Sequence, residues 1–174
     1  MYDTYVTEDS PNTNYGTSTD IRVDGAGPHG HALIAFPSIF GPGSNQIPFG
    51  AQIDLATLTV NCWNSGNTMN AYLLLQNWTQ TGATWNSRDG TSSWTNPGAD
   101  GAGSRDSTAT AWTCMPTGMY HYTMTQFISK WSNGTANYRI ALIDTGEDGN
   151  GFNSHEDPVV FEKPQLNVTF TVYT

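Results

Sequence analysis

The chain has 174 residues, the usual length of one domain, and its 6 Lys and Arg against 15 Asp and Glu give a formal net charge of −9. This charge repels phosphate backbones and anionic lipids, which excludes nucleic-acid binding and membrane-surface roles, and it disfavours an acidic polysaccharide ligand. No apolar run approaches the ~20 residues of a membrane span, which excludes membrane insertion. We expect a single domain over residues 1–174.

Short β-like runs separated by turn residues recur along the chain, and they predict an all-β sandwich of eight or more strands. Residues 32–36 and 138–143 are largely apolar, as in central strands, whereas residues 166–173 alternate between apolar and polar. The expected strands are Asp3–Thr7, Asp20–Asp24, His31–Phe36, Leu55–Asn61, Asn70–Asn77, Ser107–Cys114, Asn137–Ile143 and Leu166–Tyr173.

One short helix is expected from Thr123, its N-cap, to Trp131, with Gly134 just beyond its end. Phe127, Ile128 and Trp131 fall on one stripe of such a helix, so it can cover the sandwich as a lid on the core.

Two segments read as long loops, because they are rich in Gly, Ser, Asn and Asp and lack hydrophobic periodicity. They span residues 85–106 and 144–158. Loops of this length in a compact domain often carry binding residues.

The two cysteines, Cys62 and Cys114, both lie in strand-like runs. A disulfide between them is compatible with this placement, but the spacing does not establish it. Two cysteines without a CxxC spacing do not form a zinc site, and neither cysteine has a nucleophile context.

The chain resembles the DNRLRE domains, which include disaggregatase-related repeats and a carbohydrate-binding module family attached to polysaccharide lyases. The resemblance spans nearly the whole chain. The residues that carry it are Asp3-Thr4-Tyr5-Val6, Asn14-Tyr15-Gly16, Ile21-Arg22-Val23, Ile47-Pro48-Phe49-Gly50, Trp78, Gly82-Ala83-Thr84-Trp85-Asn86, Tyr122-Thr123-Met124-Thr125, Trp131-Ser132-Asn133-Gly134 and Phe152-Asn153-Ser154-His155-Glu156.

The resemblance implies a jelly-roll-like antiparallel β-sandwich without a catalytic centre, in which ligand binding varies between relatives. The final block departs from the family, which normally carries Arg where this chain has His155, Lys163 and Gln165. Arginines at these places could pair with acidic neighbours or contact the ligand.

Aromatic side chains can stack on the apolar face of a sugar ring while polar groups bond its hydroxyls. Trp94 lies in the polar loop 92–96, where burial has no support from the sequence, and Trp63 follows a strand end. Either could instead cover an edge of the sandwich or contact a neighbouring subunit. The predicted carbohydrate-binding residues are Trp94, Trp63, Tyr120 and Asn96.

The remaining tryptophans in family-like motifs, Trp78, Trp85 and Trp131, are expected to pack in the core. His121, between two tyrosines, is expected to be a strand histidine.

Acidic and amide side chains crowd the second loop among glycines, which supplies hard oxygen ligands on a flexible backbone, as calcium requires. The spacing does not fit an EF-hand, and a solvated acidic turn is the alternative. The predicted ligands of a structural calcium ion are Asp144, Glu147, Asp148, Asn150 and Glu156.

No catalytic motif such as GxSxG, HExxH or a P-loop is present, and nothing selects a pair of acids for hydrolysis. We therefore expect no enzyme activity. His29 and His31 would face the same side of an extended segment, but no third metal ligand is evident, and no metal is assigned to them.

The predicted function is non-catalytic recognition of a polysaccharide or cell-surface glycan. The alternative is a structural decoration, fibre or attachment protein of a virion, or a subunit of an extracellular assembly. Met1 leads directly into a polar strand without a secretion signal. An excised extracellular module suits the first hypothesis, and a complete phage protein at a virion surface suits the second.

Overall fold

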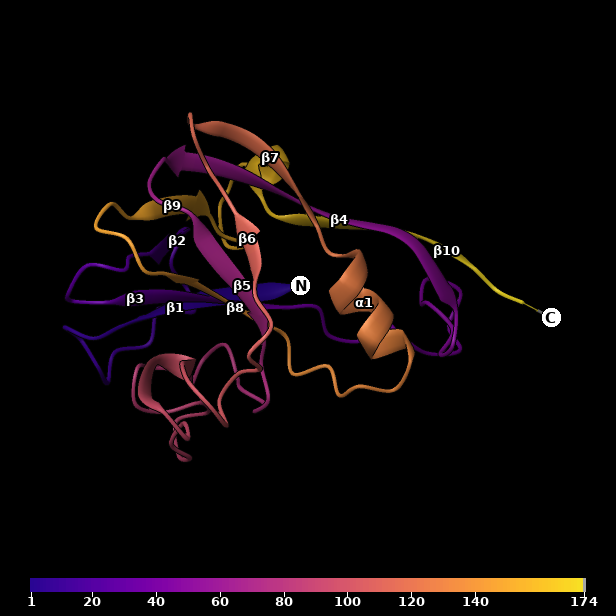
Figure 1. The fold of residues 1–174 in the computed structure, drawn as a ribbon, viewed down its shortest axis with the longest axis horizontal. Helices are drawn as coiled ribbons and strands as arrows, with labels where there is room; N and C mark the ends of the chain where they lie inside the picture. The colour runs from indigo at the N-terminus through magenta and orange to yellow at the C-terminus, as the bar shows by residue number, and fades with distance from the viewer. Residues whose placement is uncertain (174) are drawn as a thin grey trace.

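The computed structural model describes residues 1–173, which form a sandwich of two antiparallel sheets and one α-helix (Figure 1). Sheet A has the strand order β1-β3-β8-β5-β6, and sheet B has the order β10-β4-β9-β2. Strands β10 and β9 pair along successive parts of one edge of β4, and β7 pairs along its opposite edge. The predicted all-β sandwich is confirmed. The strands are β1 (Tyr2–Thr7), β2 (Asp20–Val23), β3 (Gly30–Ala35), β4 (Gln52–Asn64), β5 (Met69–Leu73), β6 (Thr110–Trp112), β7 (Gly118–Thr123), β8 (Ile140–Asp144), β9 (Asn150–Asn153) and β10 (Gln165–Thr171).

Two strands, β7 and β9, lie outside the expected runs. Strand β9 lies within the segment that was expected to be a loop, because its residues Asn150–Asn153 have little strand propensity of their own. It forms where β2 pairs along one side of it and the end of β4 pairs along the other. Two short 3₁₀ turns, Pro97–Ala99 and Val160–Glu162, complete the regular structure.

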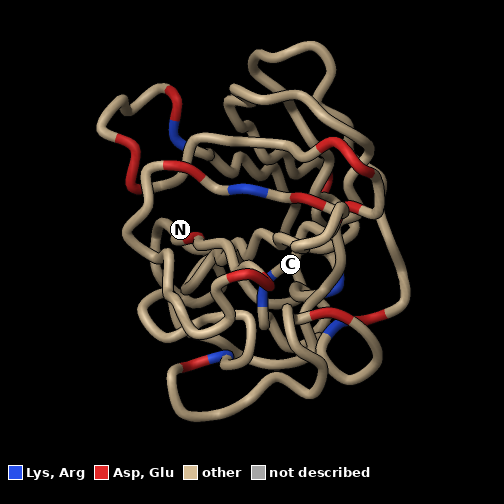
Figure 2. Tube along the Cα trace, turned by 90° about the vertical axis from the view of Figure 1, so that its left-hand side faces the viewer, with Lys and Arg blue, Asp and Glu red and all other residues tan. Residues whose placement is uncertain are grey.

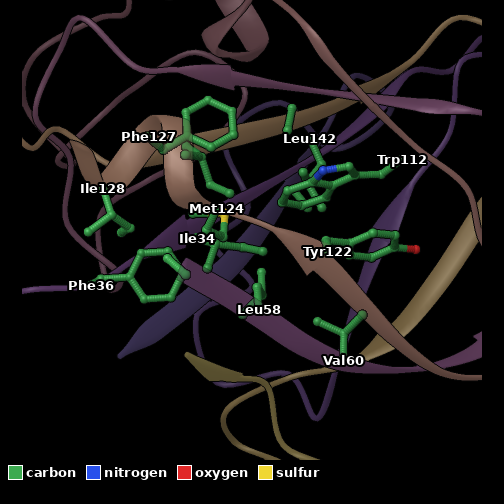
Figure 3. Close-up of a cluster of buried hydrophobic side chains, with 14 of the residues drawn as sticks. Ile34, Phe36, Leu58, Val60, Trp112, Tyr122, Met124, Phe127, Ile128 and Leu142 are labelled. Atoms are coloured by element: carbon green, nitrogen blue, oxygen red, sulfur yellow. The ribbon is translucent and has the colours of Figure 1, made fainter. Parts of the chain in front are cut away.

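The main core lies between the two sheets (Figure 3). Strand β4 shows how the alternating pattern builds it, since Leu58, Val60 and Cys62 are buried while the residues between them face outward. Cys62 is bonded to Cys114, so the disulfide that the spacing left open is present. Figure 3 shows Leu58 and Val60 among side chains from sheet A and the helix.

Helix α1 (Thr125–Ser132) closes one side of this core, as predicted. The stripe of Phe127, Ile128 and Trp131 is buried. The predicted N-cap is wrong, because Thr123 still pairs with β4 as the last residue of β7 and Met124 takes the N-cap position. Within residues 1–173, no helix is long and apolar enough to cross a membrane.

A second core lies on the opposite face of sheet A, beneath the segment that follows β5 (Figure 1). This segment was expected to be an extended loop, but it folds back over the sheet. Strands β3 and β8 are therefore buried on both faces, which explains their apolar runs. The second core contains Val6, Leu33, Ala35, Tyr72, Leu74, Trp78, Ala83, Trp94, Ala99, Ala141 and Ile143.

Candidate functional site

The expectation that Trp94 is exposed is wrong. Its side chain is 4% exposed in the second core, and its indole N–H donates a hydrogen bond to the carbonyl of Thr84 at 3.0 Å. The polar neighbours of Trp94 face solvent while the indole fills the space between the folded-back segment and sheet A. In this position the ring offers no face to a ligand.

Two other predicted binding residues, Asn96 and Tyr120, have partners within the fold. The amide of Asn96 donates to the carbonyl of Ala102 at 2.5 Å and so closes the loop around it. Tyr120 is half-buried against the main core, and its hydroxyl donates to the carbonyl of Pro116 at 2.6 Å. Neither residue lies beside Trp63 in the groove described next.

Trp63 is 46% exposed on the outer face of sheet B. The pairing of β4 with β9 is irregular between Cys62 and Asn64, and such an irregularity can redirect the side chain at its centre. The indole lies directly over Gly151 of β9, where an added Cβ would come within 2.4 Å of Cζ2 of Trp63. Because Gly151 has no side chain, the ring of Trp63 can lie against the sheet at this position.

A groove of about 360 Å³ runs beside this ring. It is built where the ends of β1, β2 and β4 meet the loop before β9, so residues distant in sequence share it. Its polar and aromatic lining, which defines the Trp63 groove, consists of Thr7, Asp9, Arg22, Asp24, Trp63, Asn64 and Asn150.

Arg22 is a cationic donor in the Trp63 groove, and Asn64 supplies an amide oxygen that can accept. Arg22 lies opposite Gly151 in the strand pairing, and its Nε donates to Asp20 at 2.7 Å, a bond that raises the pKa of the guanidinium. Asn64 donates through Nδ2 to the carbonyl of Gly149 at 2.7 Å, which leaves its side-chain oxygen as an acceptor. An aromatic face with donors and acceptors at its rim is the arrangement that binds sugars.

Comparison with known protein families gives a match over residues 1–170 to carbohydrate-binding module family 96. The chain belongs to this family. No curated protein matches the sequence of this module.

Membership supports the prediction that the chain is a carbohydrate-binding module, and such modules are generally non-catalytic. The DNRLRE name is not confirmed by the match, and the virion alternative receives no support from it. Of the residues predicted to contact carbohydrate, the structure places only Trp63 at an open groove with polar partners.

The five predicted calcium ligands do not gather in the module. Asp144 and Asn150 are buried and bonded to each other, from Nδ2 to Oδ2 at 3.1 Å, and burial raises the pKa of Asp144. Glu147 and Asp148 are exposed, and Glu156 accepts a hydrogen bond from a glutamine elsewhere. Within residues 1–173, no group of three or more His, Cys, Asp or Glu side chains could hold a metal ion. Calcium binding by this loop stays a prediction.

Reasoning from the sequence missed Arg22, Asn64 and Gly151 as parts of the groove. Arg22 and Asn64 are ordinary residues at strand ends, and only the pairing of β2, β9 and β4 brings them to one face. The one available signal was Gly151, since a glycine inside a strand often marks the close approach of another group.

Proposed function

We propose that the module binds a polysaccharide or cell-surface glycan in the Trp63 groove, with the indole of Trp63 packed against the apolar face of a sugar ring. The observation that carries this proposal is the half-exposed indole held flat over Gly151. A large aromatic ring fixed in place before binding offers contact area at little cost in side-chain entropy.

The polar rim would bond the sugar hydroxyls. Arg22 uses only Nε in its bond to Asp20, so its two terminal amino groups can donate to a ligand. Asp24 and the side-chain oxygen of Asn64 can accept. Arg22 lies on β2 and Asp24 follows it directly, whereas Asn64 lies next to Trp63 on β4, so these groups come from the two strands that flank β9.

We propose an extracellular location for the module. The disulfide between Cys62 and Cys114 supports this, since such bonds form and persist mainly in oxidising compartments. Carbohydrate-binding modules also usually work outside the cell, where their polysaccharides are.

The test is isothermal titration of Trp63→Ala with whichever neutral or acidic polysaccharide binds the wild type in a screen. A buried aromatic anchor contributes about 2 kcal/mol or more, so we expect affinity to fall at least about thirtyfold. Phe161→Ala is the matched control, because Phe161 is also exposed and lies outside the Trp63 groove. Unchanged affinity in Trp63→Ala, with normal binding in the control, would refute the proposal.

A further inference from the structure

A second cavity, of about 270 Å³, lies at the same end of the sandwich as the Trp63 groove. The turn between β2 and β3 separates the two, because Asp24 and Pro28 line the groove whereas Gly25 and His29 line the cavity. This turn and the loop between β8 and β9 project together at the left of Figure 1. The lining that defines the His31 cavity is His29, His31, Trp85, Asp100, Asp144 and Thr145.

His31 presents an unused hydrogen-bond acceptor to this cavity. The side chain is 4% exposed, and its Nδ1 lies 2.7 Å from the carbonyl oxygen of Gly98. A carbonyl only accepts, so Nδ1 carries the proton and Nε2 carries the lone pair. Within residues 1–173, Nε2 has no hydrogen-bond partner, and this atom is not fully enclosed by the protein. Burial lowers the pKa of His31, which keeps the ring neutral at neutral pH.

Trp85 supplies an aromatic face beside this acceptor. Its ring centroid lies 5.0 Å from that of His31. The indole packs against the second core, as expected from the sequence, but it is half-buried and also lines the cavity. Gly98 has a φ of +72° and packs against the indole, where an added Cβ would approach Cη2 to 2.6 Å. The same glycine therefore orients both His31 and Trp85.

The charges at this end select against an acidic ligand. Asp100 and Asp144 line the His31 cavity, and Asp9 and Asp24 line the neighbouring groove. Figure 2 looks onto this end, and acidic segments are more extensive in it than basic ones. The cation nearest to Asp100, Arg105, is already bonded to it at 2.6 Å. A uronate in the cavity would be repelled with no free cation in its lining.

We propose that the His31 cavity is a second sugar-binding pocket, which takes an uncharged sugar unit with its apolar face on Trp85 and a hydroxyl donating to Nε2 of His31. The class of ligand rests on the proposed function, but the pocket uses none of the residues of the Trp63 groove. The two can therefore fail separately.

The test is long-range proton–nitrogen NMR of the histidine rings at pH 7, on the wild type and on Trp63→Ala. The probes are neutral gluco-, manno- and xylo-oligosaccharides of four to six units and, for comparison, oligouronates. We expect at least one neutral probe to shift the Nε2 signal of His31 in both proteins. The probe concentration needed for this shift should be higher in Trp63→Ala than in the wild type. The internal control is His121, which lies on β7 and is bonded to Thr59.

A matched variant, Trp85→Ala, should lose the His31 shift while the Trp63 groove still binds, and circular dichroism verifies its fold. The proposal is overturned if no neutral probe moves the His31 signal in the wild type, or if the shift disappears whenever Trp63 is removed. Affinity that stays unchanged in Trp63→Ala, together with a His31 shift that is lost in Trp85→Ala, would refute the Trp63 groove alone. A shift with oligouronates but not with neutral probes would overturn the ligand class.

Discussion

Asp3 is a buried acid whose replacement should stabilise the module at neutral pH. The side chain is 2% exposed on β1, and Oδ2 accepts a hydrogen bond from the backbone N–H of His155 at 2.8 Å. The pKa of Asp3 is raised from 3.8 to about 7. Burial is the main cause, the hydrogen bond from His155 opposes it, and the charge of Glu156 adds to it. Asp3→Asn removes the charge and keeps an oxygen that can accept from His155.

The sign follows from proton binding. Between pH 4 and pH 7 the folded protein holds a proton on Asp3 that the unfolded chain has lost, so stability falls as the pH rises through this window. A difference of about 3 pKa units corresponds to about 4 kcal/mol at pH 8, where both states are ionised. Below pH 4 both states are protonated and the penalty vanishes.

The assay is urea unfolding of the wild type and Asp3→Asn at pH values from 4 to 8. We expect the free energy of unfolding of the variant to exceed that of the wild type by an amount that grows toward about 4 kcal/mol at pH 8. Comparing the two proteins cancels the titration of other groups. Asp148→Asn, which replaces an exposed carboxylate, is the control and should follow the wild type. Parallel curves for Asp3→Asn and the wild type at all pH values would refute the reasoning.

Three further predictions test the packing. Gly151→Ala should displace the indole of Trp63 and weaken glycan binding at least tenfold while the circular dichroism spectrum stays unchanged; unaltered affinity would show that the ring position does not matter. Trp94→Ala should lower the free energy of unfolding by about 3–5 kcal/mol, as for a core aromatic, whereas a loss of binding with full stability would contradict its burial. Replacing Cys62 and Cys114 together by Ala should lower the free energy of unfolding in urea by about 4 kcal/mol, because the disulfide closes a loop between residues 52 positions apart and so restricts the unfolded chain. A change below about 1 kcal/mol would contradict a stabilising disulfide.

The fold could be predicted from the sequence wherever one strand carries its own pattern. The apolar runs of β3 and β8 and the stripe of helix α1 identify these elements without any partner. Strand β9 could not be predicted, because its conformation depends on pairing with β2 and β4. The burial of Trp94 was missed for a related reason, since a polar loop sequence does not reveal that the loop folds back onto an apolar sheet face.

The two tryptophans at open cavities share a feature that residue type alone does not carry. Trp63 lies on Gly151 and Trp85 lies on Gly98, and in both cases a side chain on the glycine would occupy the place of the ring. A core tryptophan is held by apolar side chains on all sides, whereas a ring that stays partly open needs a flat support on one face only. Glycine supplies that support at a backbone position, so a facing glycine separates the partly open rings of Trp63 and Trp85 from the packed ring of Trp94. Its identity emerges only once the strands and loops are paired, which is why Trp94 was an equally good candidate in the sequence.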